Sequence, residues 1–288
     1  MSLSNITSAS AETNNQAQSN SLDDRESIYQ PEQDGLIFPR AKVFDTIAEE
    51  REHRKQRLVA GCRAFAMHNF DYGMAGHISV RDPEHTNLYW TNPMAVHFSQ
   101  VKMSNLILAD HEGKVVEGQH AINRAGFVVH SSVHEAHPDV VAMCHAHTPH
   151  GTAWCSTGRP IDPYNQDAAC FYDNHAVVSD DGGAVTVFTN QGEGVVDAFK
   201  NNRAVLHQNH GILTASRHSV DDAVFWFIAM DRCCHVQLLI EAMANKPALM
   251  EDDAARHSAT HVGSDYLGWL HFQPVYEQVV AANPDMFD

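Results

Sequence analysis

Two histidines separated by one residue follow an apolar run, and this pattern constrains the fold more than any other feature of the chain. The run at 140–143 is typical of a buried strand, and it leads directly into His145 and His147. Side chains two apart on a strand project from the same face, so both imidazoles can reach one ion at the roughly 2.0–2.1 Å that a metal–nitrogen bond requires. Pro149 cannot donate to a ladder, so both rings are expected at the end of a strand.

A third ligand is needed before this pattern predicts a metal site. The chain holds 21 histidines among 288 residues, so the spacing also arises by chance. Two ligands are fewer than the three or four that a zinc-type site needs. The turn Gln-Asn-His-Gly at 208–211 supplies the third, because the glycine after His210 permits tight backbone geometry while neighbouring strands hold the imidazole. We therefore predict a mononuclear metal site on His145, His147 and His210.

Size and charge exclude several classes of protein. A chain of 288 residues with 43% apolar content can bury a substantial core. The net charge of −17, with only 19 basic residues, argues against a nucleic-acid partner. No apolar run approaches the length that spans a bilayer, and no secretory signal is evident, so we expect no membrane association and a cytoplasmic location. The six cysteines form no CxxC pair and are expected to be reduced and mostly buried.

Composition divides the chain into three parts. Residues 1–34 are polar and have almost no bulky apolar side chains, so a disordered or extended tail is expected. Residues 35–250 carry the strand and helix patterns and should form the metal-binding domain. Residues 251–288 should form a helical extension that packs on the same domain.

Periodicity and turn residues predict strands mixed with helices. Asn123 is expected to cap a helix, and Ser219 with Asp222 makes a start that resembles a capping box. Besides the strand that carries His145, the strand candidates are 77–81, 88–91, 106–109, 115–117, 184–188, 204–207 and 212–214. The helix candidates are 41–70, 123–136, 151–157, 193–200, 219–244 and 265–282. This order predicts an α/β fold, a three-layer αβα sandwich with a largely antiparallel central sheet.

The two histidine motifs resemble the metal-binding signature of the class II aldolase and adducin family. The matching segments are Ala-Met-Cys-His-Ala-His at 142–147 and Asn-His-Gly at 209–211, and the resemblance covers roughly residues 48–243. It implies a class II aldolase-like αβα fold and one divalent metal ion per subunit on His145, His147 and His210. It also implies a homotetramer with active sites near the subunit interfaces.

Other positions depart from the sugar-phosphate aldolases of this family. The carboxylate that serves there as acid and base corresponds to Gly126, which can move no proton, and the paired phosphate-binding serines correspond to Arg124 and Ala125. The family's Gly-Asn-Ile-Ser loop reads Gly-His-Ile-Ser at 76–79, and its Thr-Pro-x-Gly turn reads Thr-Asn-Pro-Met at 91–94. These departures argue against phosphorylated sugars and the usual aldol mechanism.

Four further segments resemble another branch of the family, the non-haem iron oxygenases of aminocoumarin antibiotic biosynthesis. This resemblance implies enzymes that use Fe(II) and dioxygen to oxidise and shorten aromatic 2-keto or 2-hydroxy acids. Three neutral imidazoles leave open positions where a bidentate acid and O₂ can bind together. The segments are 122–127, 158–163, 166–172 and 227–234.

Several residues outside the metal site are candidates for the pocket. Arg124 and His77 can pair with a substrate carboxylate, although ordinary surface or capping roles have equal weight. Gln166 and Tyr172 are candidate substrate-binding residues on the same basis. His175 is a candidate proton shuttle, with a loop histidine bonded to a neighbour as the alternative.

Two other patterns carry weaker expectations. His130 and His134 lie one helical turn apart and can chelate an ion, but they are expected to support the first site or to pack beside it. The triplet Gly-Glu-Gly at 192–194 resembles the start of a dinucleotide fingerprint, but Asp197 stands where the third glycine belongs. No nucleotide cofactor is therefore expected.

Three functional hypotheses follow. The leading one is an Fe(II)-dependent oxygenase or oxidative decarboxylase of a small 2-keto or 2-hydroxy acid. The second is a zinc-dependent lyase for retro-aldol cleavage or decarboxylation, in which a water or His175 replaces the missing carboxylate. The third is a non-catalytic adducin-like scaffold, against which the three retained ligands argue, because converging buried polar rings are costly.

Overall fold

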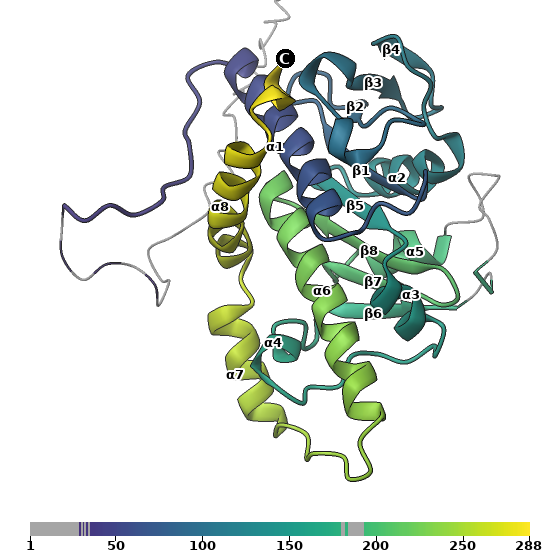
Figure 1. The fold of residues 1–288 in the computed structure, drawn as a ribbon, viewed down its shortest axis with the longest axis vertical. Helices are drawn as coiled ribbons and strands as arrows, with labels where there is room; N and C mark the ends of the chain where they lie inside the picture. Colours follow the sequence, from purple (N-terminus) through teal and green to yellow (C-terminus); the bar gives the residue numbers. More distant parts are fainter. Residues whose placement is uncertain (1–28, 30, 32, 34, 180–181, 184–192) are drawn as a thin grey trace, which may run out of the picture.

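A single eight-stranded sheet organises the computed structural model, which describes residues 29, 31, 33, 35–179, 182–183 and 193–288 (Figure 1). The strand order is β4-β3-β2-β1-β5-β8-β7-β6, and every pair is antiparallel except β6 with β7. The strands are β1 (Gly76–Arg81), β2 (Leu88–Thr91), β3 (Ile107–Asp110), β4 (Val115–Glu117), β5 (Ala142–Ala146), β6 (His175–Val178), β7 (Ala204–His207) and β8 (Gly211–Ser216).

Helices cover both faces of this sheet. The first face carries α1 (Ile47–Met67), α3 (Pro149–Cys155), α6 (Val220–Glu241) and α8 (Asp265–Ala282). The second face carries α2 (Arg124–Ala136) and α5 (Glu193–Ala198). The remaining helices are α4 (Gln166–Ala169), α7 (Asp252–Val262) and the short 3₁₀ segments η1 (Phe98–Gln100), η2 (Met103–Asn105) and η4 (Pro284–Phe287). The predicted three-layer αβα sandwich with a largely antiparallel sheet is confirmed.

Alternation along β5 divides the core into two parts. Cys144 packs among the residues of α1, α6 and α8, while Met143 packs with Val129 of α2 and Phe199 after α5. Because side chains alternate along a strand, His145 shares the face of Met143 and therefore lies on the α2 side. The layer that contains α2 thus decides what surrounds the candidate ligand.

Most element boundaries agree with the sequence-based expectations, and the differences have physical causes. Helix α1 begins at Ile47 rather than near 41, because Thr46 and Glu49 form a full capping box there. Strand β6 and helix α7 were not predicted; α7 is polar along its length and buries only Ala255. The predicted strand at 184–188 and nearly all of the predicted tail at 1–34 lie outside the described residues.

Helix α6 contradicts one expectation about composition. Among the described helices it alone is long and apolar enough, by length and composition, to cross a membrane, whereas no such run was expected from the sequence. Of the 18-residue apolar stretch of this helix, 56% is buried inside the protein. Core helices of soluble proteins have the same length and composition. It begins after the predicted cap, since the Ser219 side chain accepts a hydrogen bond from the backbone of Asp222.

The C-terminal residues pack on the rest of the chain through α8. Gln273 donates a hydrogen bond to Asp221 on α6, and Asp221 also pairs with Arg57 on α1 at 3.0 Å. Phe272 is fully buried in the core on this face. Residues 265–282 therefore join α1 and α6 in one layer, while the predicted boundary at residue 250 stays a prediction.

Close packing between α6 and α8 generates a stability prediction. A side chain at Gly268 would overlap the Trp226 indole and would approach Cβ of Asp222 to 2.8 Å. Gly268→Ala should therefore destabilise the fold by about 1–3 kcal/mol, although alanine is the better helix former. Urea unfolding should show this loss, whereas Gln278→Ala, at an exposed position of α8, should change stability little. A Gly268→Ala protein as stable as the parent would contradict this packing.

Candidate active site

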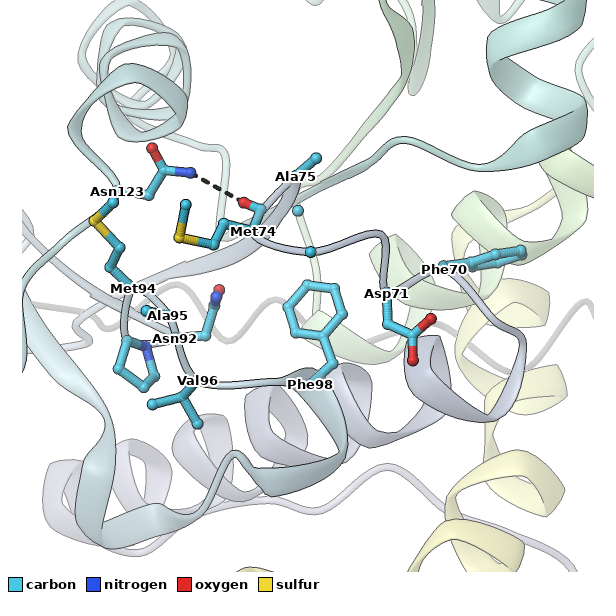
Figure 2. A pocket seen from close by; sticks show the side chains of 13 residues that line it. Phe70, Asp71, Met74, Ala75, Asn92, Met94, Ala95, Val96, Phe98 and Asn123 are labelled. Atoms are coloured by element: carbon cyan, nitrogen blue, oxygen red, sulfur yellow. Dashed lines mark hydrogen bonds between the residues drawn. The ribbon is translucent and has the colours of Figure 1, made fainter.

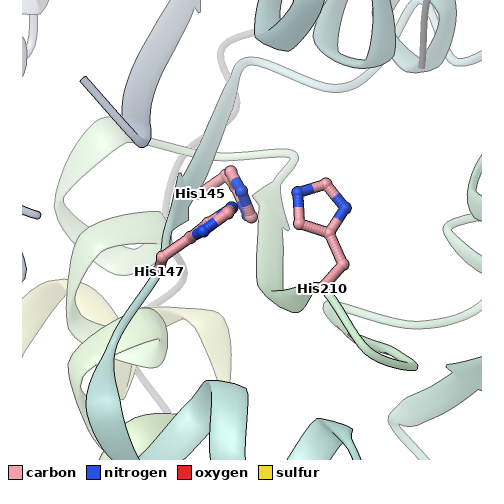
Figure 3. Close-up of side chains that lie close together, drawn as sticks. All are labelled: His145, His147 and His210. Carbon is pink, nitrogen blue, oxygen red and sulfur yellow. The ribbon is translucent and has the colours of Figure 1, made fainter. Parts of the chain in front are cut away.

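Three imidazoles converge at one end of the sheet. His145 lies on β5, His147 follows the end of that strand, and His210 lies in the turn between β7 and β8. One ring nitrogen from each lies within 4.8 Å of the other two. The ring centroids are 4.8 to 5.1 Å apart, with planes 76° to 82° from one another. Figure 3 shows the three rings facing a common space.

Pairing on both edges of β5 brings these segments together. His145 lies opposite His77 of β1 on one side and opposite Leu213 of β8 on the other. Residues far apart in sequence thus form a row across three neighbouring strands. Because partners in register project from the same face of a sheet, this row forms the floor of the site.

The turn that carries His210 differs from its predicted geometry. Its left-handed residue is Asn209, with φ of 61°, and not the glycine that follows His210. Asparagine is among the few residues that adopt this conformation readily. Gly211 instead lies against the first ligand, since an added Cβ would be 3.5 Å from Cε1 of His145.

Hydrogen bonds and burial prepare the imidazoles as ligands. Nδ1 of His145 lies 2.8 Å from the carbonyl oxygen of Ile212, to which it donates, so the lone pair belongs to Nε2. Nδ1 of His210 lies 3.1 Å from Nδ1 of His207. Burial, reinforced by the neighbouring rings, lowers the pKa of His145 well below its usual value, and burial lowers that of His147. Metals bind the neutral imidazoles that these conditions favour.

A pocket of about 250 Å³ opens beside the three rings. Its volume is near the lower end of small-molecule sites, roughly 300–1,000 Å³. The described lining residues include no aspartate or glutamate; they are Ala75, His77, Asn123, Ala125, Gly126, Val129, His145, His147, Gly183, His207, Asn209, His210 and Leu213. Three neutral nitrogen donors without a carboxylate suit zinc or Fe(II), and they leave coordination positions for a ligand on the pocket side.

His77 occupies the space beside Gly126. A Cβ at position 126 would overlap Nε2 of the His77 imidazole, so this ring and a side chain at 126 exclude each other. The His77 side chain is 8% exposed and lines the pocket. The position that His77 occupies therefore requires a residue without a side chain at 126, and glycine meets this requirement.

The N-terminus of α2 also faces the pocket. Asn123 caps this helix by accepting a hydrogen bond from the backbone of Gly126, and its amide donates to the carbonyl oxygen of Met74 at 3.2 Å (Figure 2). Asn123 and Ala75 line both this pocket and the smaller hollow of Figure 2. A helix N-terminus carries partial positive charge, which favours an anionic group in the pocket.

The other predicted pocket residues are not brought into the lining. Arg124 and Gln166 are exposed, and Tyr172 lies beneath the guanidinium of Arg256 at 5.5 Å. His175 accepts a hydrogen bond from the backbone of Ile161 at Nε2 and donates to the backbone of Phe171 from Nδ1. These four roles stay predictions that the pocket of this chain does not support.

Several lining residues were not identified from the sequence. Val129 and Leu213 were recognised only as parts of a helix and a strand, and His207 only as the end of a strand. The position of His207 three residues before His210 was the available signal. His130 and His134 form no second metal cluster in the part of the chain that the structure describes.

The chain is similar to known proteins of one family. The profile of the family described as "Class II Aldolase and Adducin N-terminal domain" matches residues 56–238. "Decarboxylase NovR" of Streptomyces niveus is 40% identical over 86% of this chain and 92% of its own length. The "4-hydroxy-3-prenylphenylpyruvate oxygenase/4-hydroxy-3-prenylbenzoate synthase" of Streptomyces roseochromogenus subsp. oscitans is 39% identical over 86% and 90%. A solved structure titled L-fuculose 1-phosphate aldolase from Glaciozyma antarctica PI12 superposes with a TM-score of 0.80, at 33% identity over 86% and 97%.

The convergence of the three rings predicts tight binding of one zinc ion per chain. His147→Ala removes one donor from a partly exposed position, so the fold should persist while the affinity falls more than roughly 100-fold. Elemental analysis and titration calorimetry should show this loss. His120→Ala, at an exposed loop position, should bind zinc as the parent does. Equal zinc binding by both variants would exclude this site.

The buried rings also predict a pH dependence of stability. Burial, with Arg81 acting in the same direction, lowers the pKa of His134 to about 3, so its ring stays neutral in the folded chain at pH 5. An unfolded histidine titrates near 6.5, so below that pH the unfolded state binds more protons. The free energy of unfolding should fall as the pH drops, by about 2 kcal/mol from this ring between pH 6.5 and 5.

Urea unfolding at pH 7.5, 6.0 and 5.0 measures this slope. Burial lowers the pKa values of His77, His130 and His145 too, so their contributions have the same sign. Stability that stays constant or rises toward pH 5 would show that these rings are protonated in the folded chain.

Proposed function

Because this chain belongs to the class II aldolase and adducin family, we propose that it is a mononuclear Fe(II) enzyme that uses dioxygen to oxidise and decarboxylate a small aromatic 2-keto or 2-hydroxy acid. The observation that carries the proposal is the pocket itself. Three neutral imidazoles converge there, and no carboxylate is among the described lining residues. A bound Fe(II) ion would supply redox chemistry with O₂ and a positive charge for the acid.

The residues of the chain supply binding and orientation. The N-terminus of α2 and the His77 ring offer polar contacts for a carboxylate or keto oxygen. Ala125, Val129 and Leu213 supply apolar surface, which suits an aromatic ring. Both kinds of contact lie beside the three ligands, so an acid bound at its polar end places its carbonyl carbon next to the metal site.

The chemistry balances without an external reductant when the substrate is a 2-keto acid. One O₂ reacts with R–CH₂–CO–COOH to give CO₂ and the 2-hydroxy acid R–CHOH–COOH, which is one carbon shorter. The bond between the keto carbon and the carboxyl carbon breaks, and the substrate supplies the electrons that reduce O₂. The names of the two Streptomyces relatives, a decarboxylase and an oxygenase, support this reaction class.

A second candidate function is a zinc-dependent lyase. The solved structure titled as a fuculose 1-phosphate aldolase, at 33% identity, favours it. Against it stands Gly126, which offers no carboxylate for proton transfer, so a water would have to serve. His175 is poorly placed for that role because both of its ring nitrogens bond to the backbone.

Assembly and location complete the proposal. We infer a homotetramer, since class II aldolase relatives are often oligomeric, and a cytoplasmic location. Light scattering of the purified chain measures the first property directly. The scaffold alternative is disfavoured, because three converging imidazoles serve no evident purpose in a domain that binds no metal.

Oxygen consumption tests the leading function. The protein is reconstituted with Fe(II) anaerobically and mixed with phenylpyruvate, 4-hydroxyphenylpyruvate, its 3-prenyl derivative or the corresponding mandelates. A 2-keto acid should consume one O₂ per CO₂ released, and His147→Ala should lower the rate more than roughly 100-fold. The His120→Ala variant serves as the control.

Two outcomes separate the candidates. Turnover by the zinc-loaded protein that proceeds equally without oxygen would favour the lyase. Absence of any turnover by the Fe(II) protein across the whole panel would overturn the oxygenase.

A further inference from the structure

A line of hydrogen bonds runs from the pocket into the space between β1 and α2. Nδ1 of His77 lies 2.9 Å from Nε2 of His130, whose Nδ1 lies 2.7 Å from the hydroxyl of Ser79. The same hydroxyl lies 2.9 Å from Nε2 of His134. At the far end, Nδ1 of His134 lies 3.4 Å from the guanidinium of Arg81. All five side chains are more than nine-tenths buried.

Matching periods of the strand and the helix produce this line. His77, Ser79 and Arg81 alternate on one face of β1, and each step of two residues advances about 6.7 Å. His130 and His134 lie one turn apart on α2, and a step of four residues advances about 6 Å. The two elements run side by side, so each strand side chain meets the next ring of the helix.

The line has two arrangements in which every hydrogen, that of the hydroxyl included, lies in a hydrogen bond. A neutral imidazole has one N–H donor and one acceptor nitrogen, and a hydroxyl donates one hydrogen and accepts through two lone pairs. If the Ser79 hydroxyl accepted from both rings, its own buried hydrogen would have no acceptor among the described residues. If Nδ1 of His134 accepts, each bond runs toward the pocket and His77 ends the line with Nε2–H. If Nδ1 of His134 donates, every bond reverses, and Nε2 of His77 presents a lone pair. The choice at one end therefore fixes the group at the other.

Arg81 decides between the two arrangements. Nδ1 of His134 lies at nearly equal distances from the Arg81 guanidinium, at 3.4 Å, and from the carbonyl oxygen of Val140, at 3.3 Å. That carbonyl already accepts a hydrogen bond from Nε of Arg81 at 3.0 Å. The two hydrogens of Nη2, the guanidinium nitrogen that lies 3.4 Å from Nδ1, go to the carbonyl oxygens of His134 and His137, at 2.6 and 3.1 Å. The guanidinium is nevertheless a permanent cation without acceptors, so its charge favours a lone pair on Nδ1 and disfavours an N–H directed at it.

We propose that Arg81, acting through His134, Ser79 and His130, fixes His77 as a neutral Nε2–H donor to an oxygen of the acid bound in the pocket. Nε2 of His77 has no hydrogen-bond partner among the described residues, and its ring lines the pocket. Burial and the neighbouring rings lower the pKa values of His77 and His130, which is consistent with neutral rings. The identity of the ligand rests on the proposed function, but the hydrogen arrangement does not.

This assignment gives the pocket a donor at the place where the aldolases have a carboxylate. A neutral N–H stabilises negative charge that develops on a keto or carboxylate oxygen, and it does so without transferring a proton. A carboxylate at position 126 would accept a proton instead. With Gly126 and His77 in place of the aldolase carboxylate and asparagine, a hydrogen-bond donor stands where those enzymes have a proton acceptor. A donor at this place suits oxidation of an acid better than it suits aldol proton transfer.

Nuclear magnetic resonance of the full-length protein, labelled with ¹⁵N-histidine, tests the arrangement directly. Long-range ¹H–¹⁵N correlations distinguish the two neutral tautomers, with and without diamagnetic zinc, and the spectrum of His77→Gln assigns the His77 signals. We expect the proton of His77 on Nε2. A proton on Nδ1 of His77, or a charged ring at pH 7.5, would overturn the proposal.

Breaking the line tests whether it sets that tautomer. Ser79→Ala removes the hydroxyl between His130 and His134, and the His77 signals should move toward a mixture of tautomers. Ser131→Ala is the matched control, because Ser131 is an equally buried serine whose hydroxyl, among the residues that the structure describes, bonds only to the carbonyl of Val128 in its own helix. An unchanged His77 tautomer in Ser79→Ala would show that the line does not transmit the preference.

Binding of phenylpyruvate to the zinc-loaded protein tests the donor role. Calorimetry should show that His77→Leu binds phenylpyruvate at least roughly tenfold more weakly than the parent, because a hydrogen bond to a charged oxygen is lost. His77→Gln keeps an N–H donor and should restore part of the affinity. One zinc ion per chain in both variants shows that the site still forms. Equal affinity in His77→Leu and the parent would overturn the donor role.

The two proposals fail in different ways. If the parent binds no phenylpyruvate while the His77 tautomer is as expected, the proposed substrate class is wrong and the hydrogen arrangement stands. If phenylpyruvate binds and is oxidised while His77 carries its proton on Nδ1, the proposed function stands and this inference fails.

Discussion

The double pairing of β5 holds the candidate site in place. β1 lies along one edge of this strand and β8 along the other, so His77, His145 and Leu213 stand in one row across the sheet. A shift of one residue in either register would turn the partner's side chains to the opposite face. The position of the metal ligands therefore depends on backbone hydrogen bonds in the middle of the sheet, where strands are paired on both edges.

The sequence predicted those parts of the site that depend on local geometry. His145 and His147 follow from the alternation of a strand, and the cap at Asn123 follows from the start of a helix. Residues that depend on tertiary contacts were missed or misplaced. Arg124 precedes two pocket residues, but each helical residue turns about 100° from the last, and this turn directs Arg124 to solvent. The lining role of Leu213 required the register of three strands, which no single segment contains.

The fold shows the same division between local and distant information. The strands at 88–91, 115–117 and 204–207 and the helices that end at Ala136 and Ala282 were predicted to the residue, because turn and cap residues mark them. Strand β6 was missed, because it pairs in parallel with β7 and no turn residue marks that crossover.

Polar groups beneath the site are bonded on the side away from the pocket, as at Nδ1 of His77 and of His145. Both rings line the pocket, where a ligand bound to the remaining nitrogen, Nε2, would offset the cost of burying them.

The mutual exclusion of the His77 ring and a side chain at Gly126 restricts the routes by which such a pocket can arise. A side chain introduced at position 126 would have to displace the His77 ring, and a smaller residue at position 77 would leave a void beside Gly126. The identities of the two positions are therefore linked. The pocket tolerates a change at one of them only when the other changes as well.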